Sequence, residues 1–434
     1  MSIKTLFPLL FLLLATSNVR AQNHLSYLEK PKMSGIHIYQ DARSKIYTLV
    51  AGSTELAPNP TLIYQLDSNA RLLVAKKLEA YGKNITSSAA SSQAGTIIAR
   101  SVELSTGQLT ANVVRLDNRL QVQWSKVVES NHITYVNAAR LSALGTTFLV
   151  GNGLSAFSDR KNYSFLCKLN GNGYKLWELT DYFTGDTVAF WRLAVDEQDY
   201  TYTAGHLGKK GLLTGINASG KVQWQQSLYY RGETRLAAIT AGQGFLYVLG
   251  ADEGSTAEEG KVFISKITTT GQMVWTTLLS AAAHHFSAGN AAIRTTAEGT
   301  VVVSLYYHDP SYQRSWAIVH LDQLGAVTHS ISCRKSGQES FPRDLFLDNN
   351  GTVAGIGTLT LAGKAAQYPL YFQGRINDLL AGQSCFAAFP ISQKSIAPEL
   401  APVTLDFIDQ VIINLNDFPV VTKDDACTIQ QVKD

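Results

Sequence analysis

The stretch Gly215-Ile216-Asn217-Ala218-Ser219-Gly220-Lys221-Val222-Gln223-Trp224 decides the fold of this chain. An apolar run ends in Ile, a polar turn with Gly follows, and Trp stands eight residues after the Ile. The stretch Lys266-Ile267-Thr268-Thr269-Thr270-Gly271-Gln272-Met273-Val274-Trp275 repeats this phrase. Repetition at a period of about 20–50 residues predicts an architecture built from stacked identical units.

Seven copies of the phrase align on the Leu or Ile before the turn. These anchors have a mean spacing of about 52 residues and are Leu66, Leu116, Leu169, Ile216, Ile267, Leu321 and Ile376. Four copies carry Trp eight residues after the anchor: Trp124, Trp177, Trp224 and Trp275. Four copies carry Gly four residues after the anchor: Gly173, Gly220, Gly271 and Gly325. The end copies are degenerate, as terminal repeats usually are.

Each period also contains an alternating run that ends in Gly about 15 residues before the anchor, such as Tyr200 to Gly205. Each repeat is therefore expected to contain four strands, A to D, with tight A–B and C–D turns. Such a twisted unit is apolar on both faces and must stack on copies of itself. Closure into a ring removes most exposed edges. The sequence predicts an all-β seven-bladed β-propeller over residues 22–390, with four antiparallel strands in each blade. An open β-solenoid is the structural alternative, but its repeats are shorter.

The residue types that recur in the phrase have a structural interpretation. Asx, Ser and Gly in the C–D turn supply side-chain hydrogen bonds and a positive φ. The large indole on strand D is suited to cover the outer gap between wedge-shaped blades. The repeated Trp and Gly residues are therefore interpreted as packing residues and not as ligand-binding residues.

The phrase resembles that of a known family. Phe165 to Gly173, Leu193 to Asp196 and Tyr200 to Gly205 resemble the repeat of bacterial secreted β-propellers, which alternates Lys-Leu-Asn-x-x-Gly-x-x-x-Trp with Val-Asp-x-x-x-x-x-Tyr-x-x-Gly. Gly220 to Trp224 is similar to the tryptophan-docking repeat of quinoprotein-like propellers. The resemblance implies the propeller fold. The vicinal cysteines of many quinone-binding propellers are absent, so no cofactor is expected and a redox role is least favoured.

The first 21 residues have the pattern of a secretory signal peptide, with Lys4, an apolar segment from Leu6 to Ala15, and small residues before a cleavage site at Ala21. The mature protein is expected to be secreted to the periplasm or the exterior, without a transmembrane segment. The formal charge of +3 includes Lys4 and Arg20. The mature chain is therefore nearly neutral, which argues against nucleic acid or an anionic membrane as a partner.

Residues 391–434 form a C-terminal tail after the last blade. Either this tail, packed as a closing strand on the last blade, or the segment His24 to Glu29 is expected to close the ring. The four cysteines allow three pairings. Cys167 is predicted to be buried, and a bond from Cys385 to Cys427 would attach the tail to the last repeat.

The B–C and D–A loops lie on one face of the ring, and many are long and varied. Variable loops on a rigid scaffold commonly carry binding sites. The candidate ligand-binding residues on this face are Trp191, Arg192, Tyr229, Arg231, His284, His285, Tyr306, His308, Asp309, Tyr312 and Arg314. Aromatic side chains beside Arg or His suit a sugar or a peptide. A solvated, Tyr-rich loop surface is the alternative interpretation.

The sequence contains no recognisable catalytic motif. It lacks the spacings of zinc sites, of haem attachment and of a nucleophile elbow. No catalytic residue and no metal site are expected, although His284-His285 and His308-Asp309 would form a metal site if they met across neighbouring blades.

We therefore expect a secreted, non-enzymatic propeller that binds a polysaccharide or a protein through its long-loop face, or acts as a scaffold. The alternative is a propeller-type lyase or hydrolase with its site at the mouth of the central channel. A quinoprotein-like redox protein is least favoured. A deep polar pocket with converging His, Arg and carboxylates would favour the enzyme, and a shallow aromatic surface would favour binding.

Overall fold

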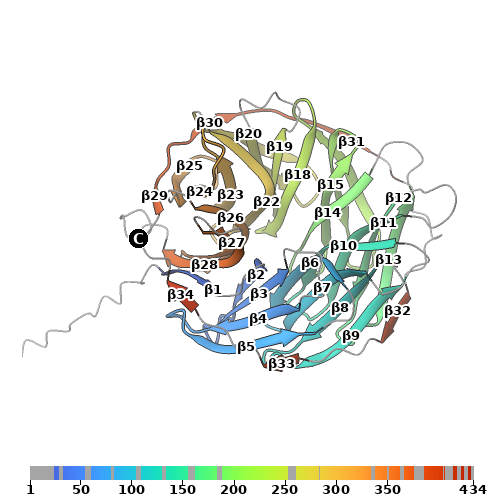
Figure 1. Ribbon diagram of the computed structural model, residues 1–434. Coiled ribbons are helices and arrows are strands. Elements are labelled where there is room, and N and C mark those ends of the chain that lie inside the picture. Colours follow the sequence, from blue (N-terminus) through green and yellow to red (C-terminus); the bar gives the residue numbers. More distant parts are fainter. Residues whose placement is uncertain are drawn as a thin grey trace, which may run out of the picture.

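The computed structural model describes residues 24–28, 33–53, 60–79, 83–103, 109–129, 133–154, 162–182, 188–252, 261–282, 284–333, 338–348, 351–361, 366–375, 386–403, 405, 414–417, 422–424 and 429–431. Within these ranges all the regular elements are β-strands, and they form seven antiparallel sheets around a central axis (Figure 1). The predicted seven-bladed β-propeller is confirmed.

The first three blades follow the chain in order. Blade 1 contains β2 (Met33–Gln40), β3 (Tyr47–Ser53), β4 (Thr61–Leu66) and β5 (Leu72–Leu78). Blade 2 contains β6 (Lys83–Ser92), β7 (Gly95–Glu103), β8 (Leu109–Leu116) and β9 (Val122–Glu129). Blade 3 contains β10 (Ile133–Leu141), β11 (Thr147–Leu154), β12 (Asn162–Leu169) and β13 (Lys175–Tyr182).

The next three blades repeat the same order from the axis outward. Blade 4 contains β14 (Val188–Val195), β15 (Thr201–Leu207), β16 (Lys210–Ile216) and β17 (Val222–Tyr229). Blade 5 contains β18 (Thr234–Gly242), β19 (Phe245–Asp252), β20 (Lys261–Thr268) and β21 (Met273–Ser280). Blade 6 contains β22 (His285–Thr295), β23 (Val301–His308), β24 (Arg314–Leu321) and β25 (Val327–Cys333).

Blade 7 combines both ends of the chain. It contains β26 (Glu339–Leu347), β27 (Thr352–Thr360) and β28 (Gln367–Arg375), and its fourth strand is β1 (His24–Leu28), which pairs with β28. The expectation that each repeat contains its own four strands is therefore wrong for blade 7, whereas the expected role of the segment that starts at His24 in closing the ring is confirmed. The N-terminal segment supplies the missing outer strand, because the chain can close the ring only by pairing its two ends.

The hydrophobic core is distributed over the interfaces between blades. Seven clusters of buried side chains each join two neighbouring blades, and together they run once around the ring. In the cluster between blades 7 and 1, for example, Ile356 and Tyr371 pack with Leu49 and Tyr64. Each sheet therefore buries both of its apolar faces against a neighbour, which drives the ring to form.

The repeated tryptophans connect each blade to the next one. Each indole Nε1 donates a hydrogen bond to a carbonyl oxygen in the C–D turn of the following blade, over 2.8–3.1 Å. The pairs are Trp124 with Gly171, Trp177 with Ala218, Trp224 with Thr269, and Trp275 with Gln323. The indole therefore fills the outer gap between blades and also provides a hydrogen-bond donor for a carbonyl oxygen of the neighbouring turn.

The glycine of the C–D turn is required for two reasons. Gly220 has a φ of +89°, which favours glycine. A Cβ on Gly220 would also lie 2.9 Å from the ring of Trp177 in the preceding blade. Asn217 completes the turn, because its Oδ1 accepts hydrogen bonds from the backbone N–H groups of Ser219 and Lys221.

The C-terminal segment forms a belt around the outer edge of the ring (Figure 1). Its short strands β29 (Phe386–Ala388), β30 (Ser392–Ser395), β31 (Glu399–Pro402), β32 (Asn414–Asp417), β33 (Thr422–Asp424) and β34 (Ile429–Gln431) each pair with the outer strand of a different blade. They add to blades 6, 5, 4, 2, 1 and 7, in that order. The expected single closing strand on the last blade corresponds only to β34.

The belt covers outer edges that would otherwise present unpaired backbone groups. Strand β34 pairs with β1, so the N-terminal strand lies between β28 and β34. Both chain ends thus contribute to the closure of blade 7. An edge strand with free N–H and C=O groups is a template for aggregation, and the belt replaces these exposed edges with short strands.

The cysteines are divided between the core and a disulfide. Cys167 is free and completely buried, as expected, while Cys333 is disulfide-bonded. The expected bond from Cys385 to Cys427 involves two residues outside the described ranges. The proposed signal peptide also lies outside these ranges. The described part of the chain has no helix with the length and apolar character needed to cross a bilayer.

Substitution Trp224→Phe is expected to reduce the free energy of unfolding by about 1–3 kcal/mol, because the carbonyl of Thr269 loses its donor. Denaturant unfolding measures the change. Tyr174→Phe is the matched control, since Tyr174 is 64% exposed and its substitution is expected to change stability by less than about 0.5 kcal/mol. Equal stability of the two variants would contradict the bridging role of the indole.

Removal of residues 391–434 is expected to lower the melting temperature. The deletion removes five of the six belt strands and so leaves the outer strands of five blades unpaired. Thermal unfolding monitored by circular dichroism measures this change, and light scattering measures the expected rise in aggregation. An unchanged melting temperature would show that the belt does not stabilise the ring.

Candidate functional site

The inner strand of each blade is interrupted by a β-bulge near the same level of the channel. The irregularity lies between Gly35 and His37 in β2, and β6, β10, β14, β18 and β26 have equivalents. In β22 it extends from Ser287 to Ala292. A bulge adds a residue to one strand and changes the direction of its side chain. The repeated bulges therefore turn extra side chains toward the axis.

A cavity of about 570 Å³ occupies the channel mouth on the face of the B–C and D–A loops. All seven inner strands contribute to its wall, including the bulge residues Asn137 and Arg343. The volume lies within the range of about 300–1,000 Å³ that is usual for small-molecule sites. The geometry thus places a ligand-sized cavity at the convergence of all the blades.

The cavity is strongly positive. Five arginines and one aspartate are its only charged lining residues among those described, which gives a formal charge of +4. The arginines are Arg140 in blade 3, Arg192 in blade 4, Arg294 and Arg314 in blade 6, and Arg343 in blade 7. Like charges that converge in a partly buried space repel one another, so an anion that enters the cavity relieves this repulsion.

Several guanidinium groups are held in place but keep free donors. Arg192 donates to the carbonyls of Ala237 and Trp191, at 2.8 and 3.0 Å. Arg140 donates to Ala139 at 2.9 Å, and Arg343 donates to the amide oxygen of Asn290. A guanidinium has five N–H donors, and the hydrogen bonds formed with described residues use at most two of them on each arginine.

Burial lowers the pKa of three arginines of the cavity. It lowers the pKa of Arg140 to about 10, and the positive charges of Arg294 and Arg192 add to the effect while Asp344 opposes it. Burial also lowers the pKa of Arg192 and of Arg343. These side chains are still charged at neutral pH, but the surroundings compensate their charge incompletely.

Both oxygens of Asp344, the one carboxylate among the described lining residues, interact with other groups of the protein. Asp344 is 6% exposed and forms an ion pair with Arg294. The oxygen that pairs with Arg294, Oδ1, also accepts a hydrogen bond from the backbone N–H of Leu345. The other oxygen, Oδ2, lies 2.5 Å from Nδ1 of His37 and accepts a hydrogen bond from the backbone N–H of Ile38. Burial alone would raise the pKa of Asp344, but Arg294, His37 and Arg140 together lower it to about 2.

Asp344 is therefore a poor general base, because such a group needs a pKa near the working pH and a free lone pair. No histidine lines the cavity among the described residues. The mouth is a polar pocket with converging arginines, as the enzyme alternative required, but the combination of histidine and reactive carboxylate is not present there. The arrangement suits the binding of an anion better than proton transfer.

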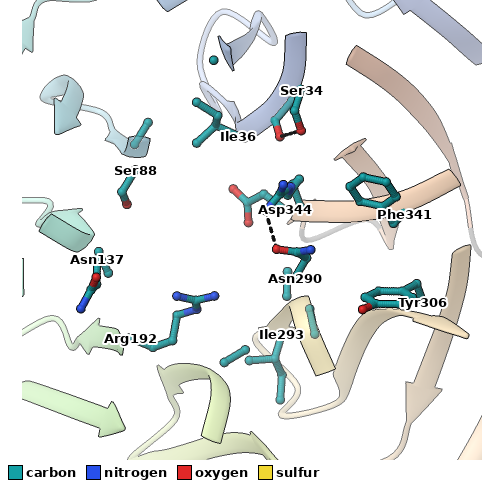
Figure 2. Close-up of a pocket in the computed structure, with 18 of the residues that line it drawn as sticks. Ser34, Ile36, Ser88, Asn137, Arg192, Asn290, Ile293, Tyr306, Phe341 and Asp344 are labelled. Atoms are coloured by element: carbon teal, nitrogen blue, oxygen red, sulfur yellow. Dashed lines mark hydrogen bonds between the residues drawn. The ribbon is translucent and has the colours of Figure 1, made fainter. Parts of the chain in front are cut away.

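One wall of the cavity is aromatic. Tyr306 and Phe341 lie side by side, with ring centroids 6.4 Å apart, and face Ser88 and Asn137 across the cavity (Figure 2). The guanidinium of Arg343 lies 5.6 Å from the centroid of the Phe341 ring. Flat rings beside fixed charges and short polar side chains can hold a ring-shaped ligand that carries hydroxyl groups and a negative charge.

A smaller cavity of about 200 Å³ adjoins the first one. Arg192 lines both cavities, and Trp191, His206 and Ala237 form much of the smaller one. The Trp191 ring is 40% exposed and stacks on the His206 ring at a centroid distance of 6.0 Å. Its Nε1 donates to Nδ1 of His206 at 2.8 Å, so the indole orientation is fixed.

The opposite mouth of the channel contains a third cavity, of about 300 Å³. Arg140 and Arg294 line both this cavity and the central one, so they mark the waist of the channel. His37 is also part of its lining, and its buried Nε2 has no hydrogen-bond partner within the described ranges.

The structure brings together only some of the candidate residues identified from the sequence. Arg192, Tyr306 and Arg314 line the central cavity, and Trp191 lines the adjoining one. Tyr229 ends the outer strand of blade 4 and pairs with the belt, far from the axis along its sheet.

Arg231 lies over the ring of Tyr230, at 5.4 Å from its centroid, and His284 packs on Tyr307 and Phe389. None of these candidates, nor Tyr229, lines a cavity described above. Their side chains interact with neighbouring residues of the blades.

The B–C connection of blade 6 is short, unlike the long and varied loops expected on this face. Tyr306 to His308 belong to β23, and Arg314 begins β24, so the loop is a tight turn. Asp309 is 1% exposed, and its Oδ1 accepts hydrogen bonds from the backbone N–H groups of Ser311 and Gln313. Asp309 therefore stabilises a turn, and Tyr312 is exposed with a φ of +61°.

The two histidine pairs of this region belong to one blade. His285 and His308 are register partners on its adjacent strands β22 and β23, so the encounter across neighbouring blades that a metal site would have required does not occur. Among the described residues, no three or more His, Cys, Asp or Glu side chains are grouped so that they could hold a metal ion.

Arg140, Arg294, Arg343 and Asp344 were not predicted from the sequence. One signal was available, because Arg140 and Arg294 occupy the same position, the third residue after the bulge, in the inner strands of blades 3 and 6. Arg192 and Asp344 likewise share the position directly after the bulge. Alignment of the A strands by structure reveals these charges, but the repeat phrase of strands C and D does not contain them.

No family model and no curated protein matches this chain. Solved structures that are similar include a Bacteroides caccae protein of unknown function, with 12% identity over 69% of this chain and 93% of that chain, and a TM-score of 0.38. A Synechocystis apocarotenoid oxygenase mutant has 10% identity over 88% of this chain and 93% of that chain, with a TM-score of 0.42.

A Pyrococcus horikoshii acylaminoacyl peptidase has 12% identity over 81% of this chain and a TM-score of 0.46. This chain spans 52% of the length of that peptidase. Identities this low carry no information about the activity of this protein.

The Asp344 carboxylate is expected to make stability depend on acidic pH. Its pKa falls from 3.8 to about 2 in the folded protein, so its contribution is present above pH 4 and is lost as the pH falls toward 2. Asp344→Asn is expected to be less stable than the wild type at pH 7, and this difference is expected to shrink between pH 4 and pH 2.

Thermal unfolding across this pH range measures the effect. Asp117→Asn in a C–D turn controls for the loss of a carboxylate, since it lies away from the channel. A constant difference between wild type and Asp344→Asn at every pH would contradict the ionised state of Asp344.

Proposed function

We propose that this protein is a secreted, non-enzymatic binding protein that holds an acidic saccharide in its central cavity. The single observation that carries the proposal is the formal charge of +4, from five arginines and one ionised aspartate, at a cavity of about 570 Å³. Guanidinium groups bind carboxylates through charge-assisted, often bidentate, hydrogen bonds.

A saccharide is favoured over a peptide for two reasons. The aromatic wall of Tyr306 and Phe341 offers flat rings beside the charges. Short polar side chains such as Ser88, Asn137 and Asn290 line the cavity and can pair with hydroxyl groups. An acidic sugar presents a ring, hydroxyl groups and a carboxylate together, so it matches all three parts of the lining.

A binding role is favoured over a hydrolase or a lyase by the state of Asp344. Two side chains and two backbone N–H groups contact its carboxylate, and its pKa is about 2. It therefore stays ionised and positions Arg294 and His37, and proton transfer would need to disrupt these contacts. Turnover of an acidic oligosaccharide by the purified protein would overturn this part of the proposal.

Calorimetric titration tests the proposal with galacturonate and trigalacturonate as probes, and with galactose and tetraglutamate as the neutral and peptide comparisons. The acidic sugars are expected to bind, galactose is not, and the affinity is expected to fall as salt is added. Binding of tetraglutamate alone would replace the saccharide with a peptide ligand. Failure of every probe would overturn an anion-binding cavity.

Variants locate the site. Arg140→Gln and Arg343→Gln are each expected to weaken binding about tenfold to a hundredfold, because a hydrogen bond to a charged group is worth about 1.5–3 kcal/mol. Arg119→Gln is the matched control, since Arg119 is an exposed residue in a C–D turn on the opposite face. Equal loss in all three variants would indicate a general charge effect and not a defined site.

A further inference from the structure

The cavity beside Trp191 adjoins the central cavity and differs from it in character. Its lining includes the small residues Ala237, Ala288 and Gly289 together with Trp191 and His206. Arg192 lies on the boundary, because it lines both cavities. A ligand that extends beyond the central cavity in this direction meets the ring of Trp191, and the second arginine of this lining, Arg235, forms an ion pair with Glu233.

The exposed indole is held in a fixed orientation. Trp191 is the inserted residue of the β14 bulge. Its ring is stacked on His206 with an interplanar angle of 26°, and its only polar atom donates to Nδ1 of that histidine. The acceptor must be an unprotonated nitrogen, and burial together with the charge of Arg235 lowers the pKa of His206, which keeps it neutral at neutral pH.

This fixed orientation is unusual for an exposed apolar side chain. Trp191 is the one tryptophan among the large hydrophobic residues that are exposed in the described ranges. The repeated indoles bridge to the next blade, whereas Trp191 bonds to a residue of its own blade. Its ring therefore does not seal an interface between blades, and an immobilised flat surface loses little conformational entropy when a ligand packs on it.

We propose that the cavity beside Trp191 is a second subsite, which holds the next sugar ring of the same acidic oligosaccharide whose charged residue occupies the central cavity. This inference rests on the proposed function. Arg192 contacts the ligand at the junction between the two rings, and Trp191 packs on the apolar face of the second ring. The protein therefore prefers chains of at least two residues over a single acidic sugar.

The test compares the affinities of galacturonate, digalacturonate and trigalacturonate for the whole protein by calorimetry. Digalacturonate is expected to bind about tenfold more tightly than galacturonate, in line with the ~1.4 kcal/mol that a packed aromatic contact can supply. Trp191→Ala is expected to remove this difference and to leave the affinity for galacturonate within about twofold of the wild type, a limit that corresponds to less than ~0.5 kcal/mol.

Tyr312→Ala is the matched control, because Tyr312 is 72% exposed and lines neither cavity. It is expected to keep the full length preference. Trp191→Phe retains a flat ring without the donor to His206, and is expected to keep part of the preference. Melting temperatures of all three variants check that each one folds.

The outcomes separate the two proposals. Equal affinity of the wild type for galacturonate and digalacturonate would overturn the second subsite and leave the central anion site standing, and this result needs no variant. A length preference that persists in a folded Trp191→Ala protein would also overturn the subsite. Absence of binding by every acidic sugar would overturn both proposals together.

Discussion

The structure depends on one constraint, which is that the ring must close. Each sheet has two apolar faces, and a buried cluster at every interface covers both faces only if blade 7 meets blade 1. Closure is achieved by β1, which supplies the outer strand of blade 7 and is itself paired with β34. The central channel exists because seven inner strands converge on one axis, so a gap in the ring would disperse the residues that line the cavity.

The electrostatics of the channel are built on this rigid frame. Charged side chains converge from blades 3, 4, 6 and 7, and the backbone carbonyls of neighbouring residues hold several of them. One carboxylate cannot neutralise five guanidinium groups, and burial increases the cost of their charge. A folded protein tolerates such a cluster only when packing elsewhere offsets its cost. The seven buried interfaces supply that stability. A bound anion would explain why the protein keeps a cluster of positive charges that costs free energy.

Much of the fold was predicted from local sequence. The Asx and Gly residues of the C–D turn and the tryptophan eight residues after the anchor act within one blade or on its neighbour, so the repeat shows them directly. The same logic failed for blade 7, whose fourth strand comes from a segment about 340 residues earlier in the chain, with Tyr27 paired to Leu370. The belt was also missed, because strands of three or four residues carry too little periodicity to be recognised.

The candidate site was predicted less well. Trp191, Arg192, Tyr306 and Arg314 were identified because aromatic and charged residues stand close together in the sequence, and they do line the two adjoining cavities. The residues that determine the charge of the cavity, such as Arg140 and Arg294, are isolated in otherwise apolar strands and meet only through the channel.

The sequence by itself determined the number of blades, the turns and the packing between neighbours, because these features depend on contacts that repeat about every 52 residues. The sequence indicated the tail or His24 to Glu29 as the closing segment, but only the tertiary structure decided that both take part, where the belt runs and which charges face one another. These features depend on residues hundreds of positions apart. The bulge in each inner strand, which is longer in β22 than in the others, determines whether a side chain enters a blade or the channel, and no local pattern in the chain specifies that direction.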